Sequence, residues 1–130
     1  MKGTAALHVF RQSSGGREVT SGEHFKAGDR LAFQIDLHAD RRVQLIGVDA
    51  HGQSYRVWPS SDTAVAMTAG ARQSIPGAVE LDDARGTETL YAVVCPPDVE
   101  APSCVSRGAA VAPSCKPGCV TSPFVMQKDP

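Results

Sequence analysis

The stretch RLAFQIDLH, residues 30–38, alternates large apolar side chains with small or polar ones. Its large apolar members are Leu31, Phe33, Ile35 and Leu37. Successive side chains of a β-strand point to opposite faces of the sheet, so these four share one face if the stretch is extended. The pattern predicts a strand with one side against a core and the other side toward water.

The same period of two recurs in short runs between residues 4 and 90. It predicts further strands at residues 5–11, 43–49, 54–58, 78–82, 87–95 and 120–128, with a weaker candidate at 65–68. For the weak candidate, a helical turn over residues 64–69 is the alternative, because Ala and Met favour helix. Residues that favour turns mark the breaks, at 14–16, 26–29, 49–52, 59–62, 75–77 and 83–86.

Strands spaced roughly ten residues apart, without long helical segments between them, are typical of antiparallel all-β folds. We therefore predict an all-β fold, an antiparallel β-sandwich of the immunoglobulin-like or a related kind. Residues 1–130 are expected to form a single domain, since a chain of 130 residues is long enough to bury its own core.

Charge and hydrophobicity exclude some partners. The formal net charge of −1 gives no electrostatic reason to expect binding to nucleic acid or to an anionic membrane. The longest apolar runs fall well short of the roughly 18 residues of a membrane span, so we expect no membrane insertion by this domain. Met1-Lys2-Gly3-Thr4 does not lead into a signal-peptide core, so either the protein is cytoplasmic or its targeting segment lies outside this sequence.

All four cysteines lie near the C-terminus, at Cys95, Cys104, Cys115 and Cys119. A zinc site with four thiolates usually takes its ligands from two short knuckles, and only the last pair is closely spaced here. A thioredoxin-like site requires two cysteines at the start of a helix, which Pro and Gly in this region disfavour. The spacing argues against both sites.

Four cysteines in a loop rich in Pro, Gly and Ser indicate cross-linking instead. Four cysteines allow three pairings, and the sequence does not choose among them. Our prediction is the nested pairing, Cys95 with Cys119 and Cys104 with Cys115, which staples a long loop, 95–119, before the last strand. Two disulfides would require an oxidising compartment, whereas the alternative is four free thiols in a cytoplasmic protein.

The polar residues contain no clear catalytic or metal-binding motif. Two short polar segments could together supply metal ligands, from Asp36, His38, Asp49 and His51. An exposed strand edge and turn explain the same residues, so we predict no metal and no cofactor.

The acidic residues Asp82 and Asp83, with Glu80 and Glu88 nearby, invite an interpretation as a calcium or acid–base site. At a hairpin turn we expect them to be exposed instead. The nucleophile elbow Gly-x-Ser-x-Gly does not occur. We therefore predict no catalytic residues and no enzyme.

Two large amphipathic aromatics are the candidates for ligand binding. Tyr55 and Trp58 would be the first choice for a surface that stacks on a sugar or a peptide. In an alternating strand, Tyr55 and Val57 face away from Arg56 and Trp58, so one member of each pair faces a core. We expect that role for Trp58, with Pro59 ending the strand.

Several landmarks follow in a set order: Phe25-x-x-Gly28-Asp29-Arg30-Leu31, Trp58-Pro59, Ile75-Pro76-Gly77, Leu81-Asp82-Asp83 and Gly86-x-Glu88-x-Leu90-Tyr91. They resemble the bacterial family called domain of unknown function 4384, over about residues 25 to 95. The resemblance implies an extracytoplasmic part of a membrane-anchored regulator, in other settings associated with protein kinases or caspase-like peptidases. It brings no catalytic residues, and the cysteine-rich loop departs from the family pattern.

The leading hypothesis is a non-catalytic extracytoplasmic sensory or protein-interaction domain of a larger bacterial envelope protein, whose partner is another envelope protein. The alternative is a periplasmic carbohydrate- or metal-binding module. It would use the two aromatics or the metal-ligand candidates named above. A hydrolase with an unrecognised site is a third hypothesis.

Overall fold

The computed structural model describes residues 5–12 and 15–129; the N-terminal segment 1–4 and the first residue of the predicted turn 14–16 lie outside the described residues. The described residues form ten strands: β1 (Ala5–Arg11), β2 (Arg17–Val19), β3 (His24–Phe25), β4 (Arg30–Leu37), β5 (Arg41–Val48), β6 (Ser54–Trp58), β7 (Val65–Met67), β8 (Gly70–Glu80), β9 (Gly86–Cys95) and β10 (Val120–Lys128).

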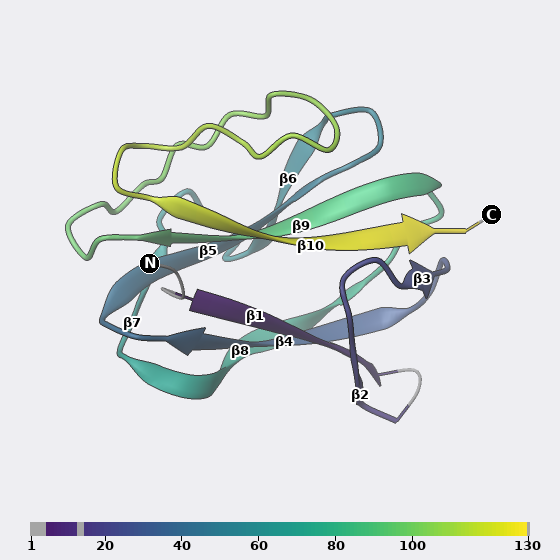
Figure 1. Ribbon diagram of the computed structural model, residues 1–130, viewed down its shortest axis with the longest axis horizontal. Helices are drawn as coiled ribbons and strands as arrows, with labels where there is room; N and C mark the ends of the chain where they lie inside the picture. The colour runs from purple at the N-terminus through teal and green to yellow at the C-terminus, as the bar shows by residue number, and fades with distance from the viewer. Residues whose placement is uncertain (1–4, 13–14, 130) are drawn as a thin grey trace.

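The strands form two sheets that pack face to face as a β-sandwich, which confirms the predicted all-β class (Figure 1). The four-stranded sheet has the order β2-β1-β4-β8, and the six-stranded sheet has the order β3-β10-β9-β5-β6, with β7 beside β5. Among the described pairings, β3 with β10 is parallel and all the others are antiparallel. The chain crosses from β2 in one sheet to β3 at the edge of the other.

The main core lies between the inner faces of the two sheets. The opening stretch forms β4 between β1 and β8, and its large apolar side chains are all buried there. The core continues with residues of the other strands and with Leu81, which follows β8: Val9, Val19, Phe25, Val43, Leu45, Ile75, Leu81, Leu90, Ala92, Val94, Phe124 and Met126.

One local prediction was wrong, and two strands were missed. The weaker strand candidate at 65–68 is confirmed, because residues 65–67 form a strand against β5, and the alternative of a helical turn over 64–69 fails. The predicted break at 75–77 lies inside β8, which begins at Gly70. Phe33 of β4 pairs with Ile75 and Leu31 pairs with Val79, so the proline and glycine mark a bulge in an edge strand. The strands β2 and β3 are too short to show a period.

A second, smaller core covers the outer face of the six-stranded sheet. Its buried members are Ile46, Val48, Tyr91, Val93 and Cys95. Most of β5 and nearly all of β9 are therefore buried on both faces, which explains the apolar runs at residues 45–48 and 90–95. The segment that covers this face is the cysteine-containing loop.

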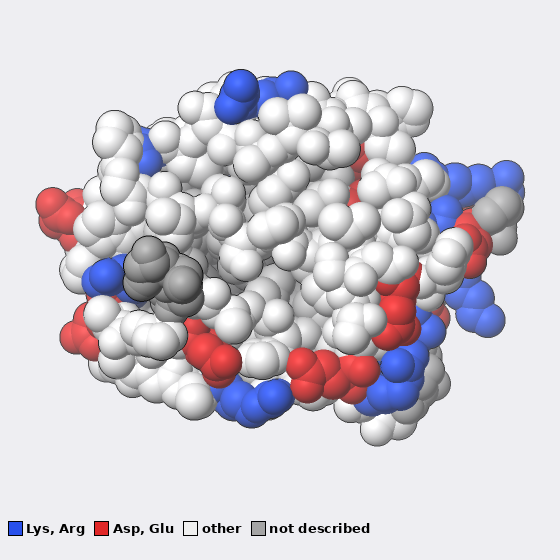
Figure 2. All heavy atoms as spheres, in the orientation of Figure 1, with Lys and Arg blue, Asp and Glu red and all other residues white. Residues whose placement is uncertain are grey.

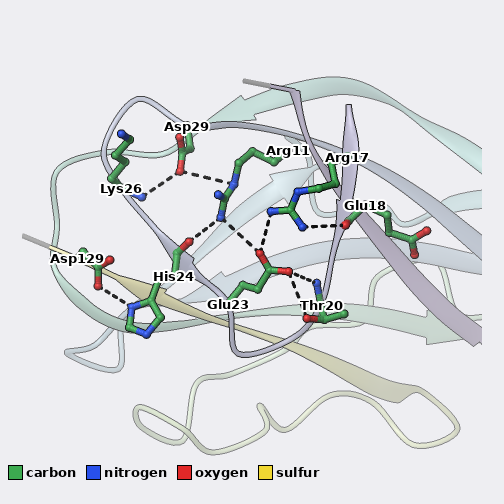
Figure 3. A network of polar contacts seen from close by, with 9 residues as sticks. All are labelled: Arg11, Arg17, Glu18, Thr20, Glu23, His24, Lys26, Asp29 and Asp129. Carbon is green, nitrogen blue, oxygen red and sulfur yellow. Dashed lines mark hydrogen bonds and ion pairs between the residues drawn. The ribbon is translucent and has the colours of Figure 1, made fainter. Parts of the chain in front are cut away.

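A network around Arg11 fastens the link between the sheets (Figure 3). The guanidinium of Arg11 lies 4.4 Å from the centre of the Phe25 ring, and it donates a hydrogen bond to the His24 carbonyl oxygen. It also lies 3.8 Å from Asp29 and 3.9 Å from Glu23. One side chain of the four-stranded sheet thus holds β3 at the edge of the other sheet.

The carboxylate of Glu23 is the acidic centre of the same network. A hydrogen bond from Arg17 at 3.1 Å, and then one from the Thr20 backbone N–H, lower the pKa of Glu23 to about 2. Both partners precede β3 in the chain, so the network shapes the turn before that strand and has a structural role.

Candidate functional site

Two nested disulfides close the loop before the last strand, as the sequence analysis predicted. Cys95, the last residue of β9, is bonded to Cys119, and Cys104 is bonded to Cys115. The intervening residues, 96–118, are called the cystine loop below. Disulfides of this kind are typical of proteins that fold in an oxidising, extracytoplasmic compartment.

The cystine loop folds back on itself and is fastened to the sheet. Val105 and Ser114 exchange two backbone hydrogen bonds, of 2.8 and 2.9 Å. Arg42 of β5 donates to the Pro97 carbonyl oxygen at 2.9 Å, and Ser106 donates through its hydroxyl to the Gly52 carbonyl oxygen. The loop is therefore a pre-shaped surface rather than an open connection.

Gly52 allows this close approach. Its φ is +81°, and a Cβ there would lie 3.1 Å from Gly108 of the loop. A larger residue would meet both a strained backbone and the loop itself.

A hollow with a volume of about 350 Å³ opens between β6 and the cystine loop. It is called the polar hollow, and its lining is Gln44, Ile46, Ser54, Tyr55, Arg56, Asp62, Ser103 and Cys104. The guanidinium of Arg56 forms an ion pair with Asp62, and both side chains are largely exposed. By contrast, Gln44 is only 4% exposed.

A second hollow, of about 410 Å³, lies between the cystine loop and the outer face of β9 and β10. It is called the apolar hollow, and its lining is Thr87, Thr89, Tyr91, Ala110, Ala112, Thr121, Pro123 and Val125. No charged side chain lines it. Small residues of the loop leave this part of the sheet uncovered.

Exposed apolar side chains gather on and next to the cystine loop. Among the described residues, four large apolar side chains are exposed, and three of them lie here: Val105 (65%), Val111 (38%) and Val120 (48%). Figure 2 shows a mostly uncharged surface over the middle and upper parts of the view, where Figure 1 places β10 and the loop. Charged side chains lie around its rim.

The two predicted ligand-binding aromatics lie on β6, outside the loop. A shift in the pairing of β5 with β6 places Trp58 opposite Leu45 and Tyr55 opposite Gly47. Trp58 packs against the main core, as expected, and lines a hollow of about 280 Å³ at the open edge of the sandwich. The Tyr55 hydroxyl donates to Glu88. A ligand-binding role for these two residues stays a prediction.

The two carboxylates considered as metal ligands accept other hydrogen bonds. The Asp49 carboxylate accepts hydrogen bonds from the backbone N–H groups of His51 and Gln53, both at 2.9 Å, and so shapes the turn after β5. Asp36 accepts a hydrogen bond from His8 at 2.8 Å. No group of three or more side chains suited to a metal ion occurs within residues 5–12 and 15–129.

The acidic residues near the 83–86 turn divide into two kinds. Asp82 is exposed, as predicted, but Glu88 is buried, which corrects that part of the expectation. Lys128, buried at the end of β10, pairs with both carboxylates and lies 3.0 Å from Glu88. Burial by itself lowers the pKa of Lys128, but its hydrogen bonds to Asp82 and Glu88 outweigh burial and raise that pKa above 10.5.

Sequence reasoning did not single out Gln44 or His8. Gln44 stands in an apolar run, and His8 finds its partners only through strand pairing. The signal that could have identified Gln44 is its position as a polar residue within an otherwise apolar run. No local signal in the sequence marks His8.

Comparison of the chain with family models, with curated proteins and with solved structures finds no match. The part of the chain that the structure describes has no helix with the length and apolar character needed to cross a membrane.

Proposed function

We propose that this chain is a non-catalytic sensory or protein-interaction domain of a larger bacterial envelope protein, and that it works in the periplasm or outside the cell. Its partner is another protein of the envelope, and the resemblance to domain of unknown function 4384 supplies the family proposed for it. The two disulfides support the location, because thiols are kept reduced in the cytoplasm.

The cystine loop is the proposed contact surface. The observation that carries this proposal is the gathering of exposed apolar side chains on a segment that two disulfides hold in shape. Exposed apolar groups next to a hollow provide burial for a partner's side chains, and a pre-shaped loop loses little entropy on binding. The surface needs no perturbed ionisable group.

The location is tested by intact mass measurement of protein made in an oxidising compartment, denatured and alkylated with and without prior reduction. Zinc content is measured on the same material. Alkylation of all four cysteines only after reduction, without zinc, is the expected result. Four alkylations without reduction, or stoichiometric zinc, would contradict an extracytoplasmic domain.

The contact surface is tested by placing a photo-crosslinking residue at Val111 or, as a control, at the exposed Glu80 of the other sheet. We expect one envelope protein to be captured from cells at Val111 and not at Glu80. A purified form of that protein should then bind the wild-type domain, and Val105→Asp should weaken binding at least about tenfold because the partner would bury a charge. Equal capture at both positions, or binding unchanged by Val105→Asp, would exclude the loop as the contact surface.

A further inference from the structure

The polar hollow has the size and setting of a small-molecule site. Its volume of about 350 Å³ is at the lower end of the range for ligand pockets, roughly 300–1,000 Å³. One wall is β5 and β6, and the other is the part of the cystine loop held by the disulfide of Cys104. Rigid elements on both sides give the hollow a fixed shape.

The buried amide of Gln44 faces this hollow with most of its hydrogen-bonding capacity unused. Gln44 lies opposite Val93 on the outer face of the sheet, while its neighbours in β5 are buried in the main core. Among the described residues its one hydrogen bond runs from Nε2 to the Ser61 carbonyl oxygen, at 3.5 Å. A primary amide offers two donors and an acceptor, so the acceptor and one donor stay open to a ligand in the hollow.

The other polar groups of the hollow favour a neutral ligand. Arg56 and Asp62 carry opposite charges and form an ion pair with each other, so the net charge of the lining is zero. Ser54 and Ser103 add hydroxyl groups, each of which both donates and accepts. A ligand suited to this lining is neutral and has several groups that donate and accept hydrogen bonds.

We propose that the polar hollow binds a neutral sugar, either a free monosaccharide or the terminal residue of a glycan. Gln44 binds the sugar hydroxyls at the floor, and the Arg56–Asp62 pair offers its remaining N–H groups and oxygen at the rim. Ile46 and the Cys104 disulfide form an apolar wall for the C–H face of the ring. The site does not use the Tyr55 hydroxyl or the Trp58 ring.

The test is a ¹H–¹⁵N NMR titration of the oxidised protein with glucose, galactose, mannose and N-acetylglucosamine, each added singly into the millimolar range. We expect at least one sugar to shift the side-chain NH₂ signals of Gln44 in a saturable way. Glycine and acetate serve as zwitterionic and anionic probes. The proposal is overturned if no sugar shifts those signals, or if only a charged probe does.

Two substitutions, each with a matched control, locate the binding. Gln44→Met keeps the size of the side chain but removes its hydrogen bonds, and it should weaken sugar binding at least about tenfold. Gln34→Met is its control, because Gln34 has a buried Oε1 without a hydrogen bond among the described residues, but on the other sheet. Equal binding by wild type and Gln44→Met, in a protein whose spectrum shows a native fold, would exclude the site.

The rim is tested in the same way by Arg56→Met. Its control is Arg30→Met, since Arg30 forms a comparably exposed ion pair with Glu80 far from the hollow. We expect the sugar affinity to fall severalfold in Arg56→Met and to stay unchanged in Arg30→Met. Equal effects of the two substitutions on sugar affinity would exclude the rim contacts. Methyl glycosides distinguish the source of the sugar, because binding of a glycoside indicates the end of a glycan and binding of the reducing sugar alone indicates a free monosaccharide.

Discussion

The hydroxyl group of Tyr55 on β6 reaches across β5 and donates a hydrogen bond to Glu88 on β9. The ring passes over Gly47, which is paired with Tyr55 and has no Cβ to obstruct it. Glu88 also pairs with Lys128 on β10 at 3.0 Å. This chain of contacts joins four neighbouring strands at one end of the main core.

Removing Lys128 should strongly destabilise the fold. Lys128→Met leaves the Glu88 carboxylate buried without its cation, and breaking a buried ion pair typically costs about 3–5 kcal/mol. The double variant Lys128→Met/Glu88→Gln should recover much of that loss, because no buried charge remains. Urea unfolding of the single, the double and the loop control Lys116→Met measures both effects. Equal stability of the single and double variants would contradict this account.

The same lysine predicts a loss of stability at alkaline pH. The folded pKa of Lys128 lies above the ordinary value of 10.5, so its contribution is complete below that pH and is lost as pH rises through the folded pKa. Stability should therefore fall above about pH 10.5 more steeply in wild type than in Lys128→Met. Parallel profiles for the two proteins would show that Lys128 is not the group involved.

Gly47→Ala should be destabilising, although alanine in a strand is usually no worse than glycine. The new methyl group would overlap the Tyr55 ring and displace its hydroxyl from Glu88, at a cost of about 1–3 kcal/mol. In a Tyr55→Ala background the same substitution should be neutral or slightly stabilising. A double-mutant cycle from urea unfolding checks this, and additive effects would exclude the proposed overlap.

His8 predicts a pH dependence near neutrality. Its hydrogen bond to Asp36 and then that to Glu18 raise the pKa of His8 above 6.5, against the effects of burial and of Arg72. The folded pKa is raised, so the contribution of protonated His8 is complete below about pH 6.5 and disappears as pH rises through the folded pKa.

The two carboxylates of this cluster respond in the opposite direction. Their hydrogen bonds to His8 lower the pKa values of Glu18 and Asp36, so their contributions are lost in acid. Urea unfolding should show that wild type loses more stability than His8→Gln as pH rises above about 6.5. His38→Gln, which changes an exposed histidine outside this cluster, should behave as wild type does. Equal losses in wild type and His8→Gln would contradict the prediction.

The two disulfides should contribute unequally to stability. The bond between Cys95 and Cys119 closes the longer loop, and Cys95 is fully buried in the smaller core. Replacing this pair by alanine should lower the free energy of unfolding by about 3–4 kcal/mol. Replacing Cys104 and Cys115 should lower it by about 2–3 kcal/mol. Thermal or urea unfolding measures the difference. The reverse order would show that the inner bond, rather than the burial of Cys95, stabilises the loop.

The all-β class could be predicted from local pattern because the alternation of side chains in a strand depends only on neighbouring residues. Residues 30–38 are the clearest case, and the spacing of the cysteines likewise predicted a cross-linked loop rather than a zinc site. The same local pattern predicted a strand end at Pro76 and Gly77, where the structure has a bulge, because proline and glycine occur both at bulges and at strand ends.

The sequence by itself determined most of the longer strands, their apolar faces and the presence of a stapled loop, whereas the tertiary structure decided which polar groups meet. Only strand register places His8 beside Asp36, and only the pairing of β6 with β5 places Tyr55 opposite Gly47, where its hydroxyl group reaches Glu88. Gln44 becomes a candidate binding group only because a distant loop forms the opposite wall. These contacts join residues far apart in the chain, and a slip of one residue in register would send each side chain to the other face.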